Sequence, residues 1–475
     1  MTRLMHLLVV VAVLMVSCGS TAVEDGAPPD AGTEAPTAVP AEPTATSLPE
    51  PTATAVPTAA PEPGGGEELR AERVEQVVDV VLAVLNGERA MSEADYDTFF
   101  ADGFRAQVPY ATFQGINAQL APSAPWSVVE PLVQGRDRGQ MLVENAAGDR
   151  VTVGVAIVEG EVTELLLQPW TEPVTDVAEA FELLEGIGEF AYLIAEVTDA
   201  DDCRRIDELD ADRAQPLGSV FKLLVLGAVV DEIAAGELSW DDPVTIRDEL
   251  DSLPSGVTQI EAPGSTRTVR ELAEVMISIS DNTATDHLLF LVGRETVEAA
   301  QARWGIEDPS LNVPFVSTKE LFHLKLSEEL RTSYVAATVD ERRSILDELA
   351  DVALPSIDEL ADIDDVWSSP IEIDTLEWFA TPADICRVLG RLALDPDARA
   401  ILETSPGVPS AQWERVGFKG GSEPGVLAVA WVVEDETGRI FTVTGGVWNK
   451  DEVFDHGAAL EAFAAVRDGF DAEPG

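Results

Sequence analysis

The spacing of apolar positions divides the chain into segments of different kinds. Leu4 to Val16 is a short, nearly unbroken apolar run behind a basic start, which is typical of a signal peptide (residues 1–17) and too short to span a membrane. Residues 18–66 are mostly Pro, Thr, Ala, Glu and Gly. This composition lacks the apolar content to fold and predicts an extended tether.

Residues 67–171 show helical spacing first and strand-like alternation afterwards. One helix is predicted to end at Gly87, and a second, short helix near Ser92 to Phe100 takes Ser92 as its N-cap. The strands that follow are separated by turn-forming residues, which suits antiparallel hairpins. We place them around Trp126–Val133, Gln140–Asn145, Arg150–Val158 and Glu161–Leu167.

Residues 172–475 form the larger predicted unit. It opens with a helix over Val174–Leu184 and a strand over Phe190–Val197, and its middle is rich in helical patterns. It closes with strands near 425–433 and 439–447 and a last helix near 457–466. We therefore expect an α+β unit whose helices flank an antiparallel sheet built from both ends of the segment.

The charge balance excludes several classes of partner. The chain has 30 Lys plus Arg against 87 Asp plus Glu, which gives a formal net charge of −57. A surface this acidic repels phosphate backbones and anionic headgroups, so neither a nucleic acid nor a lipid surface is expected as a partner. Only five of the basic residues are Lys, so the position of each Lys is informative.

The few Cys and His residues show no metal-binding spacing, so we expect no metal site. Beyond Cys18, only Cys203 and Cys386 remain, and in an exported protein they can form one disulfide. Two buried free thiols is the alternative that we favour slightly, because sequence does not establish that the residues are close. His287 and His323 lie in helical segments away from any motif and are interpreted as structural.

The first motif with chemical content is Ser219-x-x-Lys222, at the start of an apolar helix over Val220–Val230. Residues three apart share one face of a helix, so the hydroxyl and the amine are expected side by side. Burial lowers the pKa of an amine because it disfavours the charged form. A serine beside such an amine is a nucleophile with its base, and it needs no His.

Two further motifs follow along the chain. Ser280-Asp281-Asn282 opens another helix, and Lys419-Gly420-Gly421 lies on a predicted strand. Two of the five Lys residues therefore fall in motifs, and the three motifs in this order are improbable by chance.

In this order the motifs resemble those of the serine penicillin-recognising enzymes, among which class A β-lactamases are the most similar members. The likeness covers roughly residues 174–470. It implies a β-lactamase/transpeptidase-like sandwich, in which an antiparallel sheet is flanked by helices. The whole layout is similar to a group in which a small ketosteroid-isomerase-like α+β domain precedes the β-lactamase-like domain. That group includes a protein of clavulanic acid biosynthesis and mycobacterial lipoproteins, and we interpret residues 67–171 as a non-catalytic accessory domain.

The resemblance implies a role for each motif residue. Ser219 attacks a carbonyl and becomes acylated, with Lys222 as its general base. Ser280 passes the proton to the leaving atom, and Lys419 assists electrostatically. The other positions bind substrate. Asn282 holds an amide group of the substrate, and the backbone N–H groups of Ser219 and Ser422 form the oxyanion hole. Gly420 and Gly421 allow the substrate to approach the strand closely.

Two departures from the family pattern bear on turnover. In the third motif, Gly420 stands where the family usually has Thr or Ser, so a hydroxyl that binds the carboxylate of a β-lactam is missing. The deacylating Glu of the class A "ExxLN" loop has no match here, although Asp308–Asn312 imitates it with a shorter acid. Residues 313–378 are longer than the family's loop and rich in acid. We therefore do not expect efficient β-lactamase action.

The apolar run ends in Leu14-Met15-Val16-Ser17-Cys18-Gly19, which resembles a bacterial lipobox. The resemblance implies cleavage before Cys18 and lipid attachment to its thiol, and two or more acyl chains hold a protein on a membrane durably. An ordinary secretory signal with an incidental Cys is the alternative. The expected location is the outer face of a bacterial cell membrane, with the lipid on Cys18 as the only membrane contact.

The combined expectation is an exported, lipid-anchored serine hydrolase that forms an acyl-enzyme at Ser219 on a β-lactam, ester or wall-peptide amide and uses no cofactor. The first alternative is a D,D-peptidase or esterase with little β-lactamase activity. The second is a wall-associated lipoprotein that keeps the fold and binds a ligand without turnover. Gly420 and the altered loop favour this second alternative, and the retention of all four reactive side chains opposes it.

Overall fold

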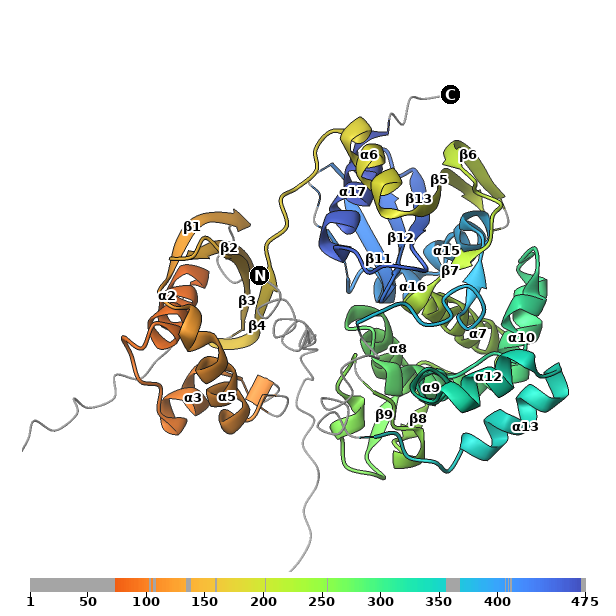
Figure 1. The fold of residues 1–475 in the computed structure, drawn as a ribbon, viewed down its shortest axis with the longest axis horizontal. Coiled ribbons are helices and arrows are strands. Elements are labelled where there is room, and N and C mark those ends of the chain that lie inside the picture. The colour runs from red at the N-terminus through yellow and green to blue at the C-terminus, as the bar shows by residue number, and fades with distance from the viewer. Residues whose placement is uncertain are drawn as a thin grey trace, which may run out of the picture.

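The computed structural model describes residues 73–470, except 102–103, 106–107, 134–137, 159, 201, 254, 356–367, 406, 409 and 411. The expected signal peptide, Cys18 and the tether lie outside the described residues. Within the described part, no helix is both long and apolar enough to cross a membrane. The described residues form an N-terminal unit, drawn in orange in Figure 1, and a larger unit, drawn in yellow, green and blue.

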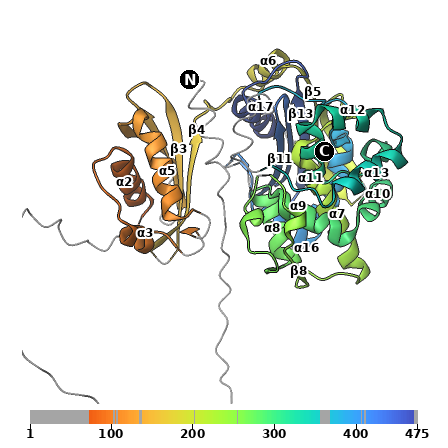
Figure 2. The ribbon, with the colours of Figure 1, turned by 60° about the horizontal axis from the view of Figure 1, so that its bottom comes forward.

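The N-terminal unit packs helices against a four-stranded antiparallel sheet with strand order β1-β2-β3-β4 (Figure 2). The first helix, α2, lies across β1, β2 and β3. A core of Val, Leu and aromatic side chains fills the space between helices and sheet. The elements are α2 (Val74–Leu85), α3 (Glu93–Phe99), α5 (Tyr110–Leu120), β1 (Trp126–Val133), β2 (Arg138–Asn145), β3 (Arg150–Val158) and β4 (Glu161–Pro169).

Most of these helices and strands agree with those predicted from the spacing of apolar residues. Ser92 is the N-cap of α3, and its side chain accepts a hydrogen bond from the backbone N–H of Asp95 at 3.1 Å. The helix α5 is an addition that the pattern missed. It contains Gly115, and its buried side chains are few, so the apolar periodicity that reveals a helix is weak there.

The larger unit is built on a five-stranded antiparallel sheet with strand order β11-β12-β13-β5-β6. The strands come from both ends of the segment, as predicted. They are β5 (Glu189–Asp199), β6 (Asp202–Leu209), β11 (Arg415–Glu423), β12 (Val426–Glu434) and β13 (Ile440–Trp448). The edge strand β6 was not predicted, because its side chains are mostly charged and exposed and show no buried face.

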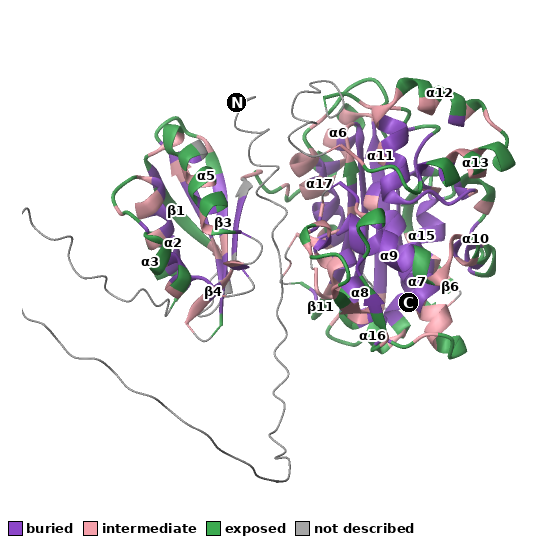
Figure 3. Cartoon of the chain, turned by 90° about the horizontal axis from the view of Figure 1, so that it is seen from below, coloured by how far each residue is buried: buried purple, intermediate pink, exposed green. Residues whose placement is uncertain are grey.

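Helices cover both faces of this sheet. The first and last helices of the unit, α6 (Val177–Ile187) and α17 (His456–Gly469), pack together on one face. On the other face α15 contacts the strands and α7 packs behind it, and the buried core runs through these layers (Figure 3). The helices of that face are α7 (Lys222–Ala235), α8 (Val269–Ser278), α9 (Asn282–Val292), α10 (Arg294–Arg303), α15 (Pro382–Leu394) and α16 (Pro396–Leu402). The predicted α+β arrangement of helix, sheet and helix layers is therefore confirmed for this unit.

The acid-rich segment from residue 313 onward contains three helices in its described part, α11 (Thr318–Leu326), α12 (Glu328–Ala336) and α13 (Val339–Leu349). Residues 368–380 then lead to the short strand β10 (Phe379–Ala380), which belongs to a separate two-stranded sheet. β10 pairs antiparallel with β7 (Gln215–Pro216). We call residues 377–380 the strap, since they lie against the residues just before Ser219.

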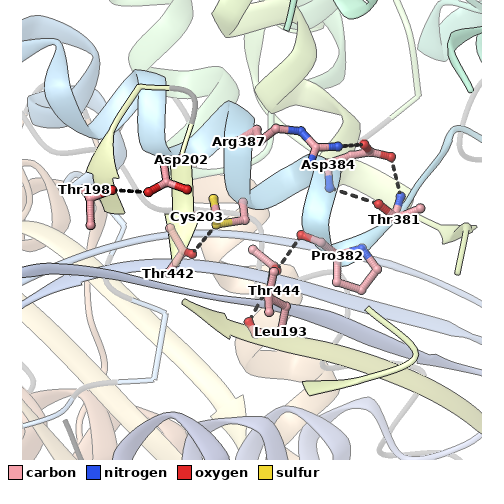
Figure 4. Close-up of a disulfide and its surroundings, with 11 residues drawn as sticks. Leu193, Thr198, Asp202, Cys203, Thr381, Pro382, Asp384, Arg387, Thr442 and Thr444 are labelled. Atoms are coloured by element: carbon pink, nitrogen blue, oxygen red, sulfur yellow. Dashed lines mark hydrogen bonds and ion pairs between the residues drawn. A yellow bond between two sulfur atoms is a disulfide. The ribbon is translucent and has the colours of Figure 1, made fainter. Parts of the chain in front are cut away.

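Cys203 and Cys386 form a disulfide, so the slightly favoured prediction of two free thiols was wrong. The bond joins β6 to α15 over a sequence separation of 183 residues, with Cα atoms 6.4 Å apart (Figure 4). The prediction failed because nothing in the sequence indicates that β6 lies at the sheet edge covered by α15. The physical basis of the pairing is the packing of that helix on β5 and β6.

Candidate active site

The residues before Ser219 are held by the strap. The backbone N–H of Leu217 donates to the carbonyl of Trp378 at 2.9 Å, and the indole ring of Trp378 stacks on Phe221 with ring centroids 3.5 Å apart. A 3₁₀ turn over Gly218–Phe221 follows, and α7 begins only at Lys222. In a 3₁₀ turn the side chains of residues i and i+3 eclipse, so Ser219 and Lys222 project from the same side.

Lys222 is fully buried, and its ammonium group contacts a second segment of the chain. Its Nζ donates to the carbonyl of Ser280, to Ser280 Oγ at 3.1 Å and to Asn282 Oδ1 at 2.7 Å. Burial lowers the pKa of Lys222 to about 7, against the opposing attraction of Asp281 and Asp286. A large fraction of Lys222 is therefore neutral near pH 7, as a general base requires.

Ser280 lies in a strained turn between α8 and α9. Its φ of 59° is in the left-handed region, which a residue with a Cβ rarely adopts. The following residue, Asp281, holds the turn in place, because its carboxylate accepts from the backbone N–H groups of Ala284 at 2.8 Å and Val257 at 2.7 Å. The strain is thus maintained by a buried carboxylate that caps α9.

Lys419 reaches Ser280 from the sheet. It lies on β11 and is 3% exposed, and its Nζ donates to Ser280 Oγ at 3.0 Å and to the carbonyl of Gly420 at 2.5 Å. Burial lowers the pKa of Lys419 well below its ordinary value, and the nearby Lys222 lowers it further. Ser280 Oγ therefore accepts from two amines, which leaves its own O–H free to donate elsewhere.

β11 passes against the turn that carries Ser219. A Cβ added to Gly421 would lie 2.1 Å from the carbonyl oxygen of Leu217 and 2.5 Å from the backbone nitrogen of Ser219. A Cβ added to Gly218, whose φ is 45°, would lie 2.9 Å from the backbone nitrogen of Ser422. The two glycines thus allow the backbone nitrogens of Ser219 and Ser422 to approach one region of space, as an oxyanion hole requires.

The structure brings the predicted site residues together: Ser219, Lys222, Ser280, Asn282, Lys419, Gly420, Gly421 and Ser422. The side chain of Asn282 is engaged within the protein, because Oδ1 accepts from Lys222 and Nδ2 donates to the carbonyl of Leu253 at 2.9 Å. Its contact with a substrate amide therefore stays a prediction. Ser422 is exposed and Gly420 is partly exposed, so both are accessible.

Two acids of the surrounding loops have defined positions. Asp308 is exposed, and its carboxylate accepts from the backbone N–H of Ser310 at 3.1 Å, so it caps a local turn. Glu377, which sequence reasoning did not single out, is buried in the strap, and its Oε2 accepts from the backbone N–H of Gly218 at 2.8 Å. No local pattern marks Glu377, because its contact with Gly218 joins residues 159 positions apart.

The two predicted structural histidines have protein partners. The Nε2 of His287 accepts from the backbone N–H of Arg247 at 2.9 Å, so its Nδ1 donates to the carbonyl of Thr283 at 2.8 Å. The Nε2 of His323 lies 3.1 Å from the carbonyl of Val352. Burial lowers the pKa of both rings.

Comparisons with known proteins agree with these motifs. Residues 193–356 match the model of a family described as the Beta-lactamase enzyme family. The matched stretch contains Ser219, Lys222, Ser280 and Asn282 and ends before Lys419. A comparison with curated proteins finds no match.

Several solved structures resemble part of this chain at low identity. A β-lactamase from Sphaerobacter thermophilus is 22% identical, covering 61% of this chain and 93% of its own, with a TM-score of 0.43. A β-lactamase from Chitinophaga pinensis is 16% identical, with coverages of 61% and 96% and a TM-score of 0.41. A variant of PBP-A in an acyl-enzyme complex with penicillin G is 15% identical, with coverages of 63% and 97% and a TM-score of 0.41.

Proposed function

We propose that this protein is an exported serine hydrolase that forms an acyl-enzyme at Ser219 on a β-lactam, ester or amide carbonyl. One observation carries the proposal: Ser280 Oγ lies within hydrogen-bond distance of both Lys222 Nζ and Lys419 Nζ, beside the turn that carries Ser219. These groups come from three segments, separated by 58 and 139 residues. Bringing two buried amines to one hydroxyl is costly, and acyl transfer is a use for that arrangement.

Acylation follows from the roles of these groups. Neutral Lys222 removes the proton from Ser219 Oγ, which bonds to the carbonyl carbon, while the oxyanion is held by the backbone N–H groups of Ser219 and Ser422. The bond to the leaving nitrogen or oxygen then breaks. Ser280 donates its proton to that atom and regains one from protonated Lys222, which leaves an ester on Ser219 and both lysines as they began.

Neither Asp308 nor Glu377 is placed to activate water for deacylation. Asp308 is exposed and caps its own turn. Glu377 is bound to the backbone of Gly218 and faces Lys325. The acyl-enzyme is therefore expected to be long-lived on β-lactams, which favours the second candidate function, a D,D-peptidase or esterase with little β-lactamase activity.

Export and anchoring form a separate part of the proposal. Disulfides persist in oxidising compartments, and the bond between Cys203 and Cys386 supports a location outside the cytoplasm. Lipid attachment at Cys18 would then hold the protein on the membrane, with residues 18–66 as a tether. Replacing Cys18 by Ser should release the protein from bacterial membranes and abolish its labelling by a fatty acid. Continued labelling would exclude Cys18 as the anchor.

The N-terminal unit is proposed to be a ketosteroid-isomerase-like accessory domain without a reaction of its own. It has helices packed on one antiparallel sheet, which is consistent with that likeness. The alternative in which the whole protein only binds a ligand remains to be separated from catalysis by experiment.

The experiment is intact-mass analysis of the protein after mixing with penicillin and with a cephalosporin ester, with Ser219→Ala beside it. An adduct of one drug mass on the wild type alone is expected, and its decay rate separates slow turnover from hydrolysis. Identical spectra for wild type and Ser219→Ala, with no drug consumed, would exclude every acyl-enzyme function and leave the binding alternative.

A further inference from the structure

Three ionisable side chains that the proposed acylation does not use meet beside the turn of Ser219. Lys325 of α11 forms an ion pair with Glu423 of β11, and its Nζ lies 3.8 Å from Glu377 of the strap. The side chains of Lys325, Glu377 and Glu423 are 6%, 1% and 14% exposed. We call these three residues the charge bridge.

Each carboxylate of the charge bridge belongs to one side of the oxyanion hole. Glu377 accepts from the backbone N–H of Gly218 at 2.8 Å, and Gly218 directly precedes Ser219. Glu423 directly follows Ser422 on β11. Lys325 therefore connects the backbone that carries one oxyanion donor to the backbone that carries the other.

Burial makes the two carboxyl groups of the charge bridge harder to ionise, and Lys325 is the cation that opposes this effect. Burial and the neighbouring Glu423 together raise the pKa of Glu377 to about 8, although Lys325 opposes both effects, so near pH 7 Glu377 holds a proton and still accepts from Gly218. Burial likewise raises the pKa of Glu423, against the ion pair with Lys325. Removing Lys325 leaves two adjacent buried carboxyls without a cation and removes a contact that joins β11 to the strap.

We propose that Lys325, Glu377 and Glu423 are positioning residues that fix the separation of the two oxyanion N–H groups, so that the helical segment α11 takes part in shaping the site. This inference rests on the proposed acyl-enzyme function. Glu377 is not placed as a base for water, because its Oε2 accepts from Gly218 and its Oε1 faces Lys325. Their effect on the reaction is therefore through backbone position.

The same helix offers a matched control. Lys319, also on α11, is 5% exposed, and its Nζ donates to the carbonyls of Glu249 at 2.7 Å and Ala350 at 3.0 Å. Burial lowers the pKa of Lys319. It is thus a second buried Lys of α11 that contacts neither side of the oxyanion hole. Lys319→Met removes a buried cation and its hydrogen bonds without touching the charge bridge.

The decisive pair of variants is Glu377→Gln and Glu377→Leu in the full protein. Gln keeps an oxygen that accepts from Gly218, whereas Leu does not. With penicillin as the probe, Glu377→Leu should acylate 10- to 100-fold more slowly, while Glu377→Gln should stay within about threefold of wild type, since misplacement of a donor by about 1 Å costs up to about 10²-fold. Lys325→Met should resemble Glu377→Leu, and Lys319→Met should resemble wild type.

A spectroscopic readout separates positioning from general loss of structure. In the acyl-enzyme formed with carbonyl-labelled penicillin, hydrogen bonds from the oxyanion hole lower the infrared stretching frequency of the ester carbonyl. That band should move to higher frequency in Lys325→Met and Glu377→Leu and should be unchanged in Lys319→Met. If Glu377→Leu fails to fold by circular dichroism, Lys325→Met decides in its place.

The possible failures are distinguishable. Wild-type acylation with an unshifted carbonyl band and unchanged rates in folded Lys325→Met and Glu377→Leu would overturn the charge bridge and leave the acyl-enzyme function intact. Absence of acylation in the wild type itself, matched by Ser219→Ala, would overturn the proposed function and this inference with it.

Discussion

The two units differ sharply in the charge that they bury. Among the described residues of the N-terminal unit, the buried polar side chains are the neutral Asn145 and Thr152. The larger unit buries four of the protein's five Lys residues, and the fifth, Lys450, is exposed. Taking an ammonium group out of water costs several kcal/mol, so each buried Lys needs a compensating role.

The buried lysines of the larger unit have different compensations. Lys319 and Lys325 are satisfied by carbonyls or by carboxylates. Lys222 and Lys419 also donate to carbonyl oxygens, but they differ from the other two because both reach the same hydroxyl, Ser280 Oγ. Two buried amines that converge on one hydroxyl are better explained by reactivity than by stability. This difference can be tested by replacing each kind of Lys with Met.

The largest effect is expected from Lys222→Met. The general base is removed while volume is nearly kept, so the rate of acylation by penicillin should fall about 10³-fold. Thermal unfolding should be unchanged or shifted upward, because the cost of burying an amine is also removed. Lys319→Met should show the opposite behaviour, with a lower unfolding temperature and an acylation rate close to wild type. Similar acylation rates in the two variants would contradict the assignment of Lys222 as the base.

A slightly smaller effect is expected from Gly421→Ala. The added Cβ would lie 2.1 Å from the carbonyl oxygen of Leu217 and must push β11 away from the Ser219 turn. Because an oxyanion-hole donor contributes about 10²- to 10³-fold, acylation should slow by that factor while the fold is retained. Stopped-flow measurement with a chromogenic cephalosporin tests this. An Ala variant with the wild-type rate would show that the close approach at Gly421 does not shape the site.

The next largest effect is expected when the acylation rate of the wild type is measured as a function of pH. The pKa of Lys222 is about 7, and only its neutral form accepts the proton of Ser219. The rate should rise with pH and level off above about 7, and at pH 5 it should be about 100-fold below its plateau. The residual acylation rate of Lys222→Met should not show this rise with pH. A wild-type profile that is flat between pH 5 and 8 would exclude Lys222 as the titrating base.

The same pKa shift has a consequence for stability. Unfolded Lys222 regains its ordinary pKa, so between about pH 7 and pH 10 the unfolded chain binds a proton that the folded protein does not. Stability contributed by this residue therefore increases with pH across that window. Below about pH 7 both states bind the proton, and the contribution no longer changes with pH.

The sequence motifs predicted which candidate side chains lie together in the structure, but not which residues position them. Ser219, Lys222, Ser280 and Lys419 could be predicted because their residue types and order carry the chemistry. Glu377 could not be, since its role depends on the pairing of the strap with residues 215–216, which is a long-range contact. The same limit hid the disulfide, whose partners are 183 residues apart.

The local sequence pattern also gave one wrong helix boundary and missed two elements. The start of α7 was predicted at Ser219, but the helix begins at Lys222 after a 3₁₀ turn, because Gly218 has a positive φ and lies against β11. The exposed strand β6 and the helix α5 have few buried side chains, so their periodicity gives little signal. Tertiary packing decides structure at these places.

The smallest effect is expected in the N-terminal unit, from Gly115→Ala. Gly115 lies in α5 with an ordinary helical φ, and a Cβ at this position would meet nothing within 4 Å. Because Gly in a helix costs about 0.5–1 kcal/mol relative to Ala, the variant should be more stable by up to that amount in a urea titration. Acylation should be unchanged, since this unit contributes no described side chain to the site. A changed acylation rate would show that the N-terminal unit is coupled to the reaction and that the contrast between the two units does not separate their functions.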